Sequence, residues 1–329
     1  MIHRIALTPG DPEGIGPEIA AKVCSNPAIL ARAEIILLGD RHAIRSAFET
    51  HGDSRFLVDL STIGESLRPG TCGLFDPYDE EDNVDPAPEI AAIRSAVAGC
   101  QNGMFKAMVT GPIDKAKLMA LGFPYPGHTN FLSALTGAPR PVMTFISQGL
   151  RVSLVTDHVP LKDVPTVVTR EAILQTIQIA QADLIRWYGM ENPRIAVCGL
   201  NPHAGELGRL GSEDQDVVAP AIYDAQALGI LASGPHPSDT VFAKARAGDF
   251  DLVIALYHDQ GLIPIKLLGL GAAVHLTFGL PILRTSVDHG TAKDIAHQGI
   301  ANPEGLRAAL VEAIRLQNPL RSHPPLPSS

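Results

Sequence analysis

Short runs of apolar and β-branched residues alternate along this chain with longer segments in which apolar residues recur at helical spacing. Strands that are buried on both faces have continuous apolar runs, and the helices that connect them need one apolar face. The pattern predicts strands at residues 5–7, 35–38, 107–110, 142–146, 152–156, 195–198, 252–256 and 273–277. It predicts helices at residues 16–24, 89–98 and 170–187, the last with Thr169 as its N-cap. These elements predict an α/β fold with largely parallel sheets.

Composition changes this picture mainly by excluding other classes of protein. The chain has 329 residues, of which 45% are hydrophobic and 19% charged, enough for about two domains with sizeable cores. Its 26 basic and 35 acidic residues give a formal net charge of −9 with no long basic run, so nucleic acid is not an expected partner. No apolar run reaches the roughly 18–20 residues of a membrane span, and no signal peptide is recognisable. Four scattered cysteines suit a reducing compartment, and we expect a cytoplasmic protein with no membrane association.

Polar motifs directly follow several predicted strands, where open α/β proteins bind their ligands. The motif GDPEGIGPE at residues 10–18 opens a helix, and its glycines would let a ligand approach the helix-start amides, although a structural turn would use the same residues. In GPIDK, Lys115 lies in the first turn of a helix, where the helix dipole makes a cation unfavourable. Contact with an anionic ligand would explain this cation, and the alternative is a solvated surface lysine. In PGHTN, His128 and Thr129 place an imidazole and a hydroxyl at another helix start, which suits an anion.

Three histidines, each after an apolar strand, carry the strongest chemical signal. His158, His203 and His258 lie far apart in the sequence, but parallel strands of one sheet would bring their ends together. Three neutral imidazoles with an open coordination position form a catalytic zinc site rather than a closed structural one. The alternative is three separate histidines, each hydrogen-bonded within its own turn. Asp157 and Asp259, next to two of these histidines, would orient the rings or act as a general base.

Two further cations belong to the same region, at the carboxyl ends of the predicted strands. Lys266 and Arg284 both suit a phosphate or carboxylate, Arg284 through its bidentate fork and Lys266 as a point charge. Taken one at a time, each is more often a surface or ion-pair residue. Beside the other motifs, they indicate a small anionic ligand.

Together these motifs resemble one family, the 4-hydroxythreonine-4-phosphate dehydrogenases of pyridoxal phosphate biosynthesis, which are relatives of isocitrate and isopropylmalate dehydrogenases. The blocks GDPxGIGPE, GPIxK, PGHT, NPHAGE, HDQG and RTSVDHGTA occur here in the family's order. The resemblance implies a two-lobed α/β/α fold like that of isopropylmalate dehydrogenase, with the active site in the cleft between the lobes. We assign residues 1–130 and 285–329 to the first lobe. Residues 131–284 would form the second, with the metal ligands and the dimer interface.

The resemblance also implies roles for individual residues. His158, His203 and His258 would bind a divalent metal (zinc, cobalt, magnesium or manganese) in an active site shared by the two subunits of a homodimer. NAD or NADP would bind without the classical fingerprint, which fits the absence of GxGxxG. The predicted substrate-binding residues are His128, Thr129, Lys266, His275 and Arg284. The predicted cofactor-binding residues are Gly10, Asp11, Gly14, Gly16 and Asp288, and the predicted catalytic residues are Asp259, Lys115 and Asp239.

The implied chemistry is an oxidation followed by loss of CO2 from a small phosphorylated four-carbon acid. Metal coordination of the substrate's 3-hydroxyl lowers that group's pKa, hydride passes to the nicotinamide, and the 3-oxo acid decarboxylates readily. From 4-phosphooxy-L-threonine this gives 3-amino-2-oxopropyl phosphate for pyridoxal 5′-phosphate biosynthesis. Threonate or erythronate 4-phosphate would instead give dihydroxyacetone phosphate. More distant alternatives are a zinc hydrolase and a non-catalytic phosphosugar-binding protein.

Three positions depart from the family's pattern. Asp114 replaces an asparagine in GPIxK, and Asn130 replaces a glutamate after PGHT. His275 stands where the family usually has an asparagine that contacts substrate. Because imidazole and amide differ in size and in hydrogen bonding, His275 bears on which four-carbon acid is the substrate.

Overall fold

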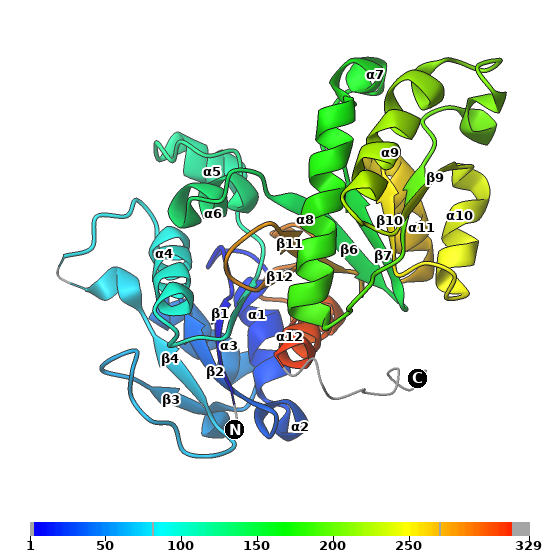
Figure 1. Cartoon of the computed structure of the whole chain (residues 1–329). Coiled ribbons are helices and arrows are strands. Elements are labelled where there is room, and N and C mark those ends of the chain that lie inside the picture. Colours follow the sequence, from blue (N-terminus) through cyan, green and yellow to red (C-terminus); the bar gives the residue numbers. More distant parts are fainter. Residues whose placement is uncertain (1–2, 81, 270, 318–329) are drawn as a thin grey trace. The chain divides into compact units, whose positions relative to one another are not determined.

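Figure 1 shows the computed structural model, which describes residues 3–80, 82–269 and 271–317. Within these residues the chain forms two compact units. The first runs to Pro141 and resumes at Leu280, and the second comprises Val142–Gly279. The lobe boundaries at residues 130 and 285 stay predictions.

The first unit contains a parallel sheet in the order β3-β4-β2-β1-β5-β12. Its strands are β1 (His3–Thr8), β2 (Ala33–Leu38), β3 (Leu57–Asp59), β4 (Cys72–Phe75), β5 (Ala107–Thr110) and β12 (Arg284–Val287). Its α-helices are α1 (Gly16–Cys24), α2 (Pro27–Leu30), α3 (Arg41–His51), α4 (Pro88–Gln101), α5 (Lys115–Ala120), α6 (His128–Thr136) and α12 (Glu304–Leu316).

Both faces of this sheet are buried, which explains the continuous apolar runs of its strands. Ala6 and Met108 pack on one face against Ile90 and Ile93 of α4. Alternate residues of β1, such as Leu7, point to the other face and are equally buried. Helix α12 contacts β5, β12 and α1.

The second unit contains a mixed sheet in the order β11-β6-β7-β10-β8-β9, in which β6 is antiparallel to β11 and β7 and the remaining pairs are parallel. Its strands are β6 (Val142–Ser147), β7 (Leu150–Leu154), β8 (Ile195–Cys198), β9 (Ala232–His236), β10 (Leu252–Ala255) and β11 (Val274–Phe278). Its α-helices are α7 (Val164–Val167), α8 (Arg170–Tyr188), α9 (Ala219–Ala227), α10 (Ser238–Arg246) and α11 (His258–Leu268). Strands β6 and β7 form a hairpin whose turn residues, Gln148 and Gly149, both have positive φ, as a two-residue type I′ turn requires.

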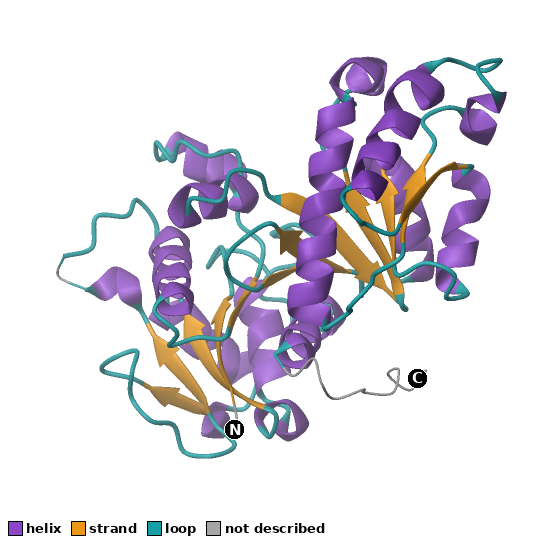
Figure 2. Ribbon diagram, viewed as in Figure 1, coloured by secondary structure: helices purple, strands orange, loops and turns teal. Residues whose placement is uncertain are grey.

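The predicted α/β fold with largely parallel sheets is confirmed (Figure 2). Each predicted strand is present, and so are the three predicted helices. The N-cap of α8 is confirmed because the Thr169 hydroxyl accepts a hydrogen bond from the Ala172 amide at 3.1 Å. The pattern missed β3, β4, β9 and β12, which are short or contain polar residues, glycine or proline. Among the described helices, none has the length and apolarity needed to cross a membrane.

Candidate active site

The three predicted metal ligands follow the carboxyl ends of three adjacent parallel strands in the second unit. His158 follows β7, His258 begins α11 after β10, and His203 follows β8. The register places β10 between β7 and β8. This edge of a parallel sheet is where α/β proteins bind their ligands, because helices cover both faces and the connecting loops leave it open.

His158 and His258 come together at this edge. Their ring centroids lie 5.4 Å apart with the planes tilted by 36°. The Nδ1 atom of His258 contacts Oδ1 of Asp259 at 2.7 Å. A carboxylate on Nδ1 favours the tautomer that leaves Nε2 as the metal ligand, so the pair matches two of the imidazoles of a divalent metal site.

His203 does not join this pair. The described residues of the chain contain no group of three His, Cys, Asp or Glu side chains close enough to hold one ion. His203 and Ala204 adopt left-handed conformations, with φ of 52° and 54°, and His203 is exposed. The buried carboxylate of Asp214 holds this loop by accepting the Leu200 amide at 2.7 Å and the Asn201 amide at 3.0 Å. Neighbouring strand ends therefore do not assemble the predicted three-histidine site within one chain, and the ligand roles stay a prediction.

Gln260, which the sequence analysis did not single out within HDQG, ties these strand ends together. Its Oε1 accepts the Leu256 amide at 2.6 Å, and its Nε2 donates to the Gly199 carbonyl at 2.8 Å and to Oγ of Ser238 at 2.9 Å. These bonds join the ends of β10 and β8 to the start of α10. Because Gln260 is buried, losing its partners would leave polar groups unsatisfied, so it fixes the base of the loops that carry the histidines.

Asp239 and Asp259, two of the predicted catalytic residues, line one hollow of about 400 Å³, and its lining includes both sequence neighbours of His258, Tyr257 and Asp259. Asp239 is the second residue of α10 and Asp259 is the second residue of α11, and Tyr257, the residue before α11, also lines the hollow. Desolvation by burial raises the pKa of Tyr257, so its phenol is neutral at pH 7. The lining of the hollow therefore includes two carboxylates and the hydroxyls of Tyr257 and Ser238.

The first unit holds a separate cluster of cations. Arg284, the first residue of β12, is 2% exposed, and its Nε and Nη2 atoms donate to the Thr110 hydroxyl at 3.1 and 2.7 Å. Burial lowers the pKa of Arg284 to about 9, and the guanidinium remains charged at pH 7. The Thr110 hydroxyl also contacts Oγ of Ser286 at 3.0 Å. Arg284 therefore places a buried positive charge in this part of the first unit, which suits an anionic ligand.

His128 lies close enough to Arg284 and Lys115 to respond to their charges. Burial, followed by repulsion from Arg284 and Lys115, holds the pKa of His128 well below its usual range, so the ring is neutral near pH 7. Its buried Nε2 finds no hydrogen-bond partner among the described residues. The Lys115 side chain passes over Gly127, where a Cβ atom would lie 3.1 Å from its Cε. An unsatisfied imidazole close to two cations is chemically suited to an oxyanion ligand.

The remaining predicted substrate-binding residues occupy both units. Thr129 is half-buried in the first turn of α6, beside His128. Lys266 is half-buried in the last turn of α11, and His275 lies on β11. The His275 ring stacks on Phe145 of β6, with centroids 4.8 Å apart and planes 15° from parallel. The structure shows His275 as a buried ring within the sheet, and its contact with substrate stays a prediction.

The glycines of GDPEGIGPE pack closely against the backbone of other residues, so each of these positions has a structural requirement for glycine. A Cβ atom on Gly10 would lie 2.0 Å from the Pro112 carbonyl oxygen, and Gly10 has a φ of 92°. A Cβ on Gly16 would lie 2.0 Å from the Pro9 oxygen, and one on Gly14 would lie 2.9 Å from the Thr291 oxygen. These contacts explain the glycines without a ligand, and their cofactor role stays a prediction. Asp288, also predicted to bind cofactor, follows β12 directly and is half-buried.

Asp11, the remaining predicted cofactor-binding residue, is fully buried and forms ion pairs within the chain. Its Oδ1 lies 3.0 Å from Nζ of Lys117, and its Oδ2 lies 2.9 Å from Nζ of Lys293. Sequence analysis missed both lysines because their partners belong to distant segments. The pairing assigns Asp11 a structural role beside its predicted one.

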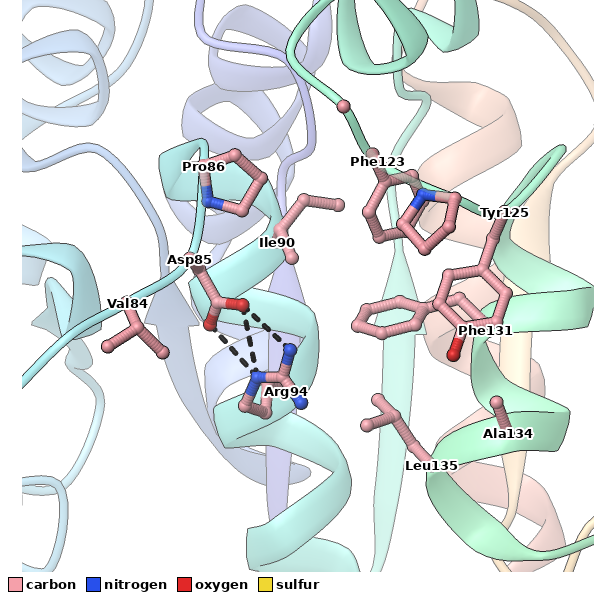
Figure 3. Close-up of a pocket in the computed structure, with 12 residues that line it drawn as sticks. Val84, Asp85, Pro86, Ile90, Arg94, Phe123, Tyr125, Phe131, Ala134 and Leu135 are labelled. Carbon is pink, nitrogen blue, oxygen red and sulfur yellow. Dashed lines mark hydrogen bonds and ion pairs between the residues drawn. The ribbon is translucent and has the colours of Figure 1, made fainter.

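An apolar hollow of about 370 Å³ lies elsewhere in the first unit, between α4 and α6 (Figure 3). Phe123, Tyr125 and Phe131 line it with ring centroids 4.9–5.3 Å apart. Its charged lining residues, Arg94 and Asp85, pair with each other at 2.7 Å. Since their charges already satisfy one another, this hollow is less suited to a phosphorylated acid than the Arg284 cluster.

Known proteins resemble this chain along nearly its whole length. The family model "Pyridoxal phosphate biosynthetic protein PdxA" matches residues 31–313. A 4-hydroxythreonine-4-phosphate dehydrogenase of Geobacter metallireducens is 42% identical over 323 residues, 95% of each chain. The crystal structure of the Klebsiella pneumoniae 4-hydroxythreonine-4-phosphate dehydrogenase superposes with a TM-score of 0.86 at 36% identity and covers 95% of this chain and 99% of its own. A terephthalate 1,2-cis-dihydrodiol dehydrogenase of Burkholderia xenovorans is more distant, with a TM-score of 0.63 at 27% identity over 97% of this chain and 98% of its own.

The α/β fold, the polar residues at its strand ends and these matches define an oxidoreductase of the dehydrogenase class. More narrowly, the chain belongs to the PdxA family of pyridoxal phosphate biosynthetic proteins.

Proposed function

We propose that this chain oxidises 4-phosphooxy-L-threonine at C3 with NAD or NADP and that decarboxylation then gives 3-amino-2-oxopropyl phosphate. Relatives that share about 40% identity carry the name of this dehydrogenase. The observation that carries the proposal is the neutral His128 ring, whose buried Nε2 has no partner among the described residues and which lies close to the charges of Arg284 and Lys115. Such a site suits an anion, and the substrate's phosphate supplies one.

Phosphate recognition rests on the chain's own donors. Arg284 and Lys115 contribute charge, the neutral His128 ring contributes one N–H donor, and Thr129 contributes a hydroxyl in the first turn of α6. The amides at the start of α6 add the partial positive charge of a helix N-terminus. Lys266 and His275 are the proposed contacts from the second unit. We propose that the buried hydroxyls of Thr110 and Ser286 keep Arg284 aimed at the phosphate.

The histidine pair supports a divalent metal site completed by a second copy of the chain. His158 and His258 fit as two ligands, and the exposed His203 of a second copy would supply the third, which makes the functional unit a homodimer. The donor set suits zinc and cobalt, and magnesium or manganese less well because they prefer oxygen ligands. A bound metal ion lowers the pKa of a coordinated substrate hydroxyl, and the nicotinamide accepts the hydride.

Three side chains are the proposed catalytic residues. Asp259 orients His258 through its contact with Nδ1, and Asp239 faces the same hollow from α10. A carboxylate in this hollow would accept the proton of the substrate's 3-hydroxyl. Lys115 is the proposed cation beside the phosphate end of the substrate. Gly10, Asp11, Gly14, Gly16 and Asp288 remain the proposed cofactor-binding residues, and the proposed location of the enzyme is the cytoplasm.

The test is a direct assay of the purified protein with zinc or cobalt, NAD or NADP, and 4-phosphooxy-L-threonine. We expect absorbance at 340 nm to rise and an amino-ketone phosphate to form together with CO2. Threonate and erythronate 4-phosphates serve as the comparison substrates, and turnover of these in preference to the amino acid would replace the proposed substrate. Hydrolysis of a phosphate or amide bond with no change at 340 nm would refute the oxidation itself.

A further inference from the structure

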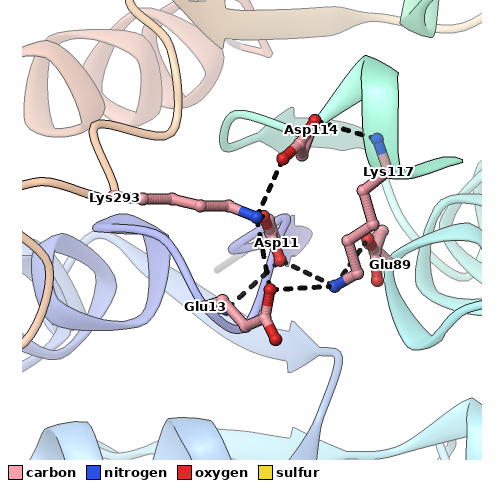
Figure 4. A network of polar contacts seen from close by, with 6 residues as sticks. All are labelled: Asp11, Glu13, Glu89, Asp114, Lys117 and Lys293. Carbon is pink, nitrogen blue, oxygen red and sulfur yellow. Dashed lines mark hydrogen bonds and ion pairs between the residues drawn. The ribbon is translucent and has the colours of Figure 1, made fainter.

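Two lysines and four carboxylates form a polar network around the start of α5 (Figure 4). The ammonium group of Lys293 lies 2.8 Å from Oδ2 of Asp114, 2.9 Å from Oδ2 of Asp11 and 3.2 Å from Oε2 of Glu13. The ammonium group of Lys117 lies 3.0 Å from Oδ1 of Asp11. Asp11 is therefore held between the two lysines.

A fourth carboxylate, that of Glu89 at the start of α4, closes the network on the side of Lys117. Its Oε1 lies 3.7 Å from the lysine ammonium, and the side chain is almost fully buried. Burial raises the pKa of Glu89, an effect that the charge of Lys117 only partly offsets. Burial would also raise the pKa of Asp11, but hydrogen bonds from Lys293 and Lys117 outweigh it and leave that pKa below its usual range.

The network joins four segments that are far apart in the sequence, one of which is the start of α4 with Glu89. Lys293 and Lys117 connect the other three. Asp11 belongs to the glycine-rich turn after β1, Asp114 and Lys117 belong to the start of α5, and Lys293 belongs to the loop after β12. Backbone hydrogen bonds also connect these segments. The Asp11 amide donates to the Pro112 carbonyl at 2.9 Å, and the Ile15 amide donates to the Thr291 carbonyl at 2.9 Å.

Asp114 has two separate roles within this arrangement. Its Oδ1 accepts the Lys117 amide at 3.1 Å, which caps the N-terminus of α5, and its Oδ2 carries the ion pair with Lys293. A neutral asparagine would keep the cap acceptor and lose the ion pair. The charge at this position therefore has a partner in the loop after β12, which explains why an aspartate is suitable here.

We propose that Lys293, through Asp114 and Asp11, is a positioning residue that clamps the glycine-rich turn, the start of α5 and the loop after β12 into one arrangement. Lys115 follows Asp114 directly and extends over Gly127, the residue before His128. The clamp thus sets the place from which Lys115 acts on the phosphate site. It also sets the turn that contains the proposed cofactor glycines, and this part of the inference rests on the proposed function.

Amide hydrogen exchange tests the clamp without any turnover. We expect Lys293→Met and Asp114→Asn each to speed exchange of the Asp11 and Ile15 amides by roughly tenfold or more, because local opening becomes easier. Exchange of the buried Ile177 amide in α8 should not change. The matched control is Arg55→Met, which removes an exposed ion pair with Asp53 on the same unit and should leave all three amides unchanged.

Kinetics provides the second readout. With 4-phosphooxy-L-threonine we expect Lys293→Met to raise the KM for the dinucleotide by roughly tenfold, with a smaller fall in kcat, and Lys293→Arg to restore most of the loss. Unchanged exchange at Asp11 and Ile15, or equal acceleration across α8, would overturn the clamp. If the wild-type chain reduced no dinucleotide with this substrate, the proposed function would fall, and the exchange data alone would decide the clamp.

Discussion

At the scale of single residues, the clearest chemical feature is the buried guanidinium of Arg284, which donates two hydrogen bonds to the Thr110 hydroxyl. Desolvation makes a buried cation costly, and it lowers the pKa of Arg284 to about 9. The same physics makes this guanidinium a strong partner for an incoming oxyanion, because hydrogen bonds to charged groups are stronger than neutral ones. The proposed contact with the substrate's phosphate and the desolvation cost of burial therefore fall on the same residue.

Replacing Arg284 should therefore affect phosphorylated substrates selectively. We expect Arg284→Met to lower kcat/KM for 4-phosphooxy-L-threonine by about 10- to 1,000-fold, since each charged hydrogen bond contributes about 1.5–3 kcal/mol. The same variant should change kcat/KM for unphosphorylated 4-hydroxythreonine much less. Equal losses with both compounds would show that Arg284 does not contact the phosphate. Thermal unfolding of the variant separates lost binding from lost folding.

His128 should make stability depend on pH. Because the pKa of His128 is held below its unfolded value of about 6.5, the unfolded chain binds more protons in this range. The stabilisation from a neutral His128 is complete above about pH 6.5 and is lost as the pH falls below that value toward the folded pKa. Urea unfolding between pH 7.5 and 5 should show a smaller pH dependence in His128→Gln than in the wild type. Identical slopes would show that the ring titrates normally.

At the scale of elements, a local sequence pattern predicts a helix or strand correctly where the residues that stabilise it lie within that element or next to it. Thr169 illustrates this, since its hydroxyl caps α8 through a residue three positions away. The strand runs succeed because burial on both faces demands continuous apolar residues. Strand β9, with sequence ASGPH, and strand β12, with sequence RTSV, carry no such pattern. These two strands are stabilised by pairing with β8 and β5, which are distant in the sequence, so a short stretch of sequence cannot predict them.

The α8 cap provides a stability test at this scale. Thr169→Ala should lower the free energy of unfolding by about 1 kcal/mol, the usual cost of losing an N-cap. Thr169→Ser keeps the hydroxyl and should stay within about 0.5 kcal/mol of the wild type. Urea denaturation of the three proteins checks this. Equal stability of the alanine and wild-type proteins would mean that packing of the apolar face alone holds the helix start.

At the scale of the whole molecule, the positions of the histidines lead to a prediction about a metal site that two copies of the chain would share. His158 and His258 lie together in one copy, and His203 lies outside their reach within the described residues. Mixed dimers of a His158→Ala chain and a His203→Ala chain should therefore regain one intact site, about half of the wild-type activity. Each homodimer alone should be inactive.

The control for this experiment pairs His158→Ala with His258→Ala. Because these two rings belong to the same copy, every site in such a mixed dimer carries one lesion, and no activity should return. Bound metal per dimer, measured on the same samples, should follow the activity. Recovery in the control, or none in the test pair, would refute a site shared between copies.

The sequence by itself determined the α/β class, most of the strands and the motifs of the family, because periodicity, caps and turn residues act over a few positions. It also indicated that His158, His203 and His258 follow strand ends. Only the tertiary structure decided that His158 and His258 meet, while His203, in a left-handed loop next to residues held by Asp214, forms no three-ligand group with them among the described residues. Tertiary structure likewise brought Arg284 to Thr110, and Lys293 to Asp11 and Asp114. These contacts join segments separated by more than 100 residues, and their energies depend on burial and distance, which no local pattern records.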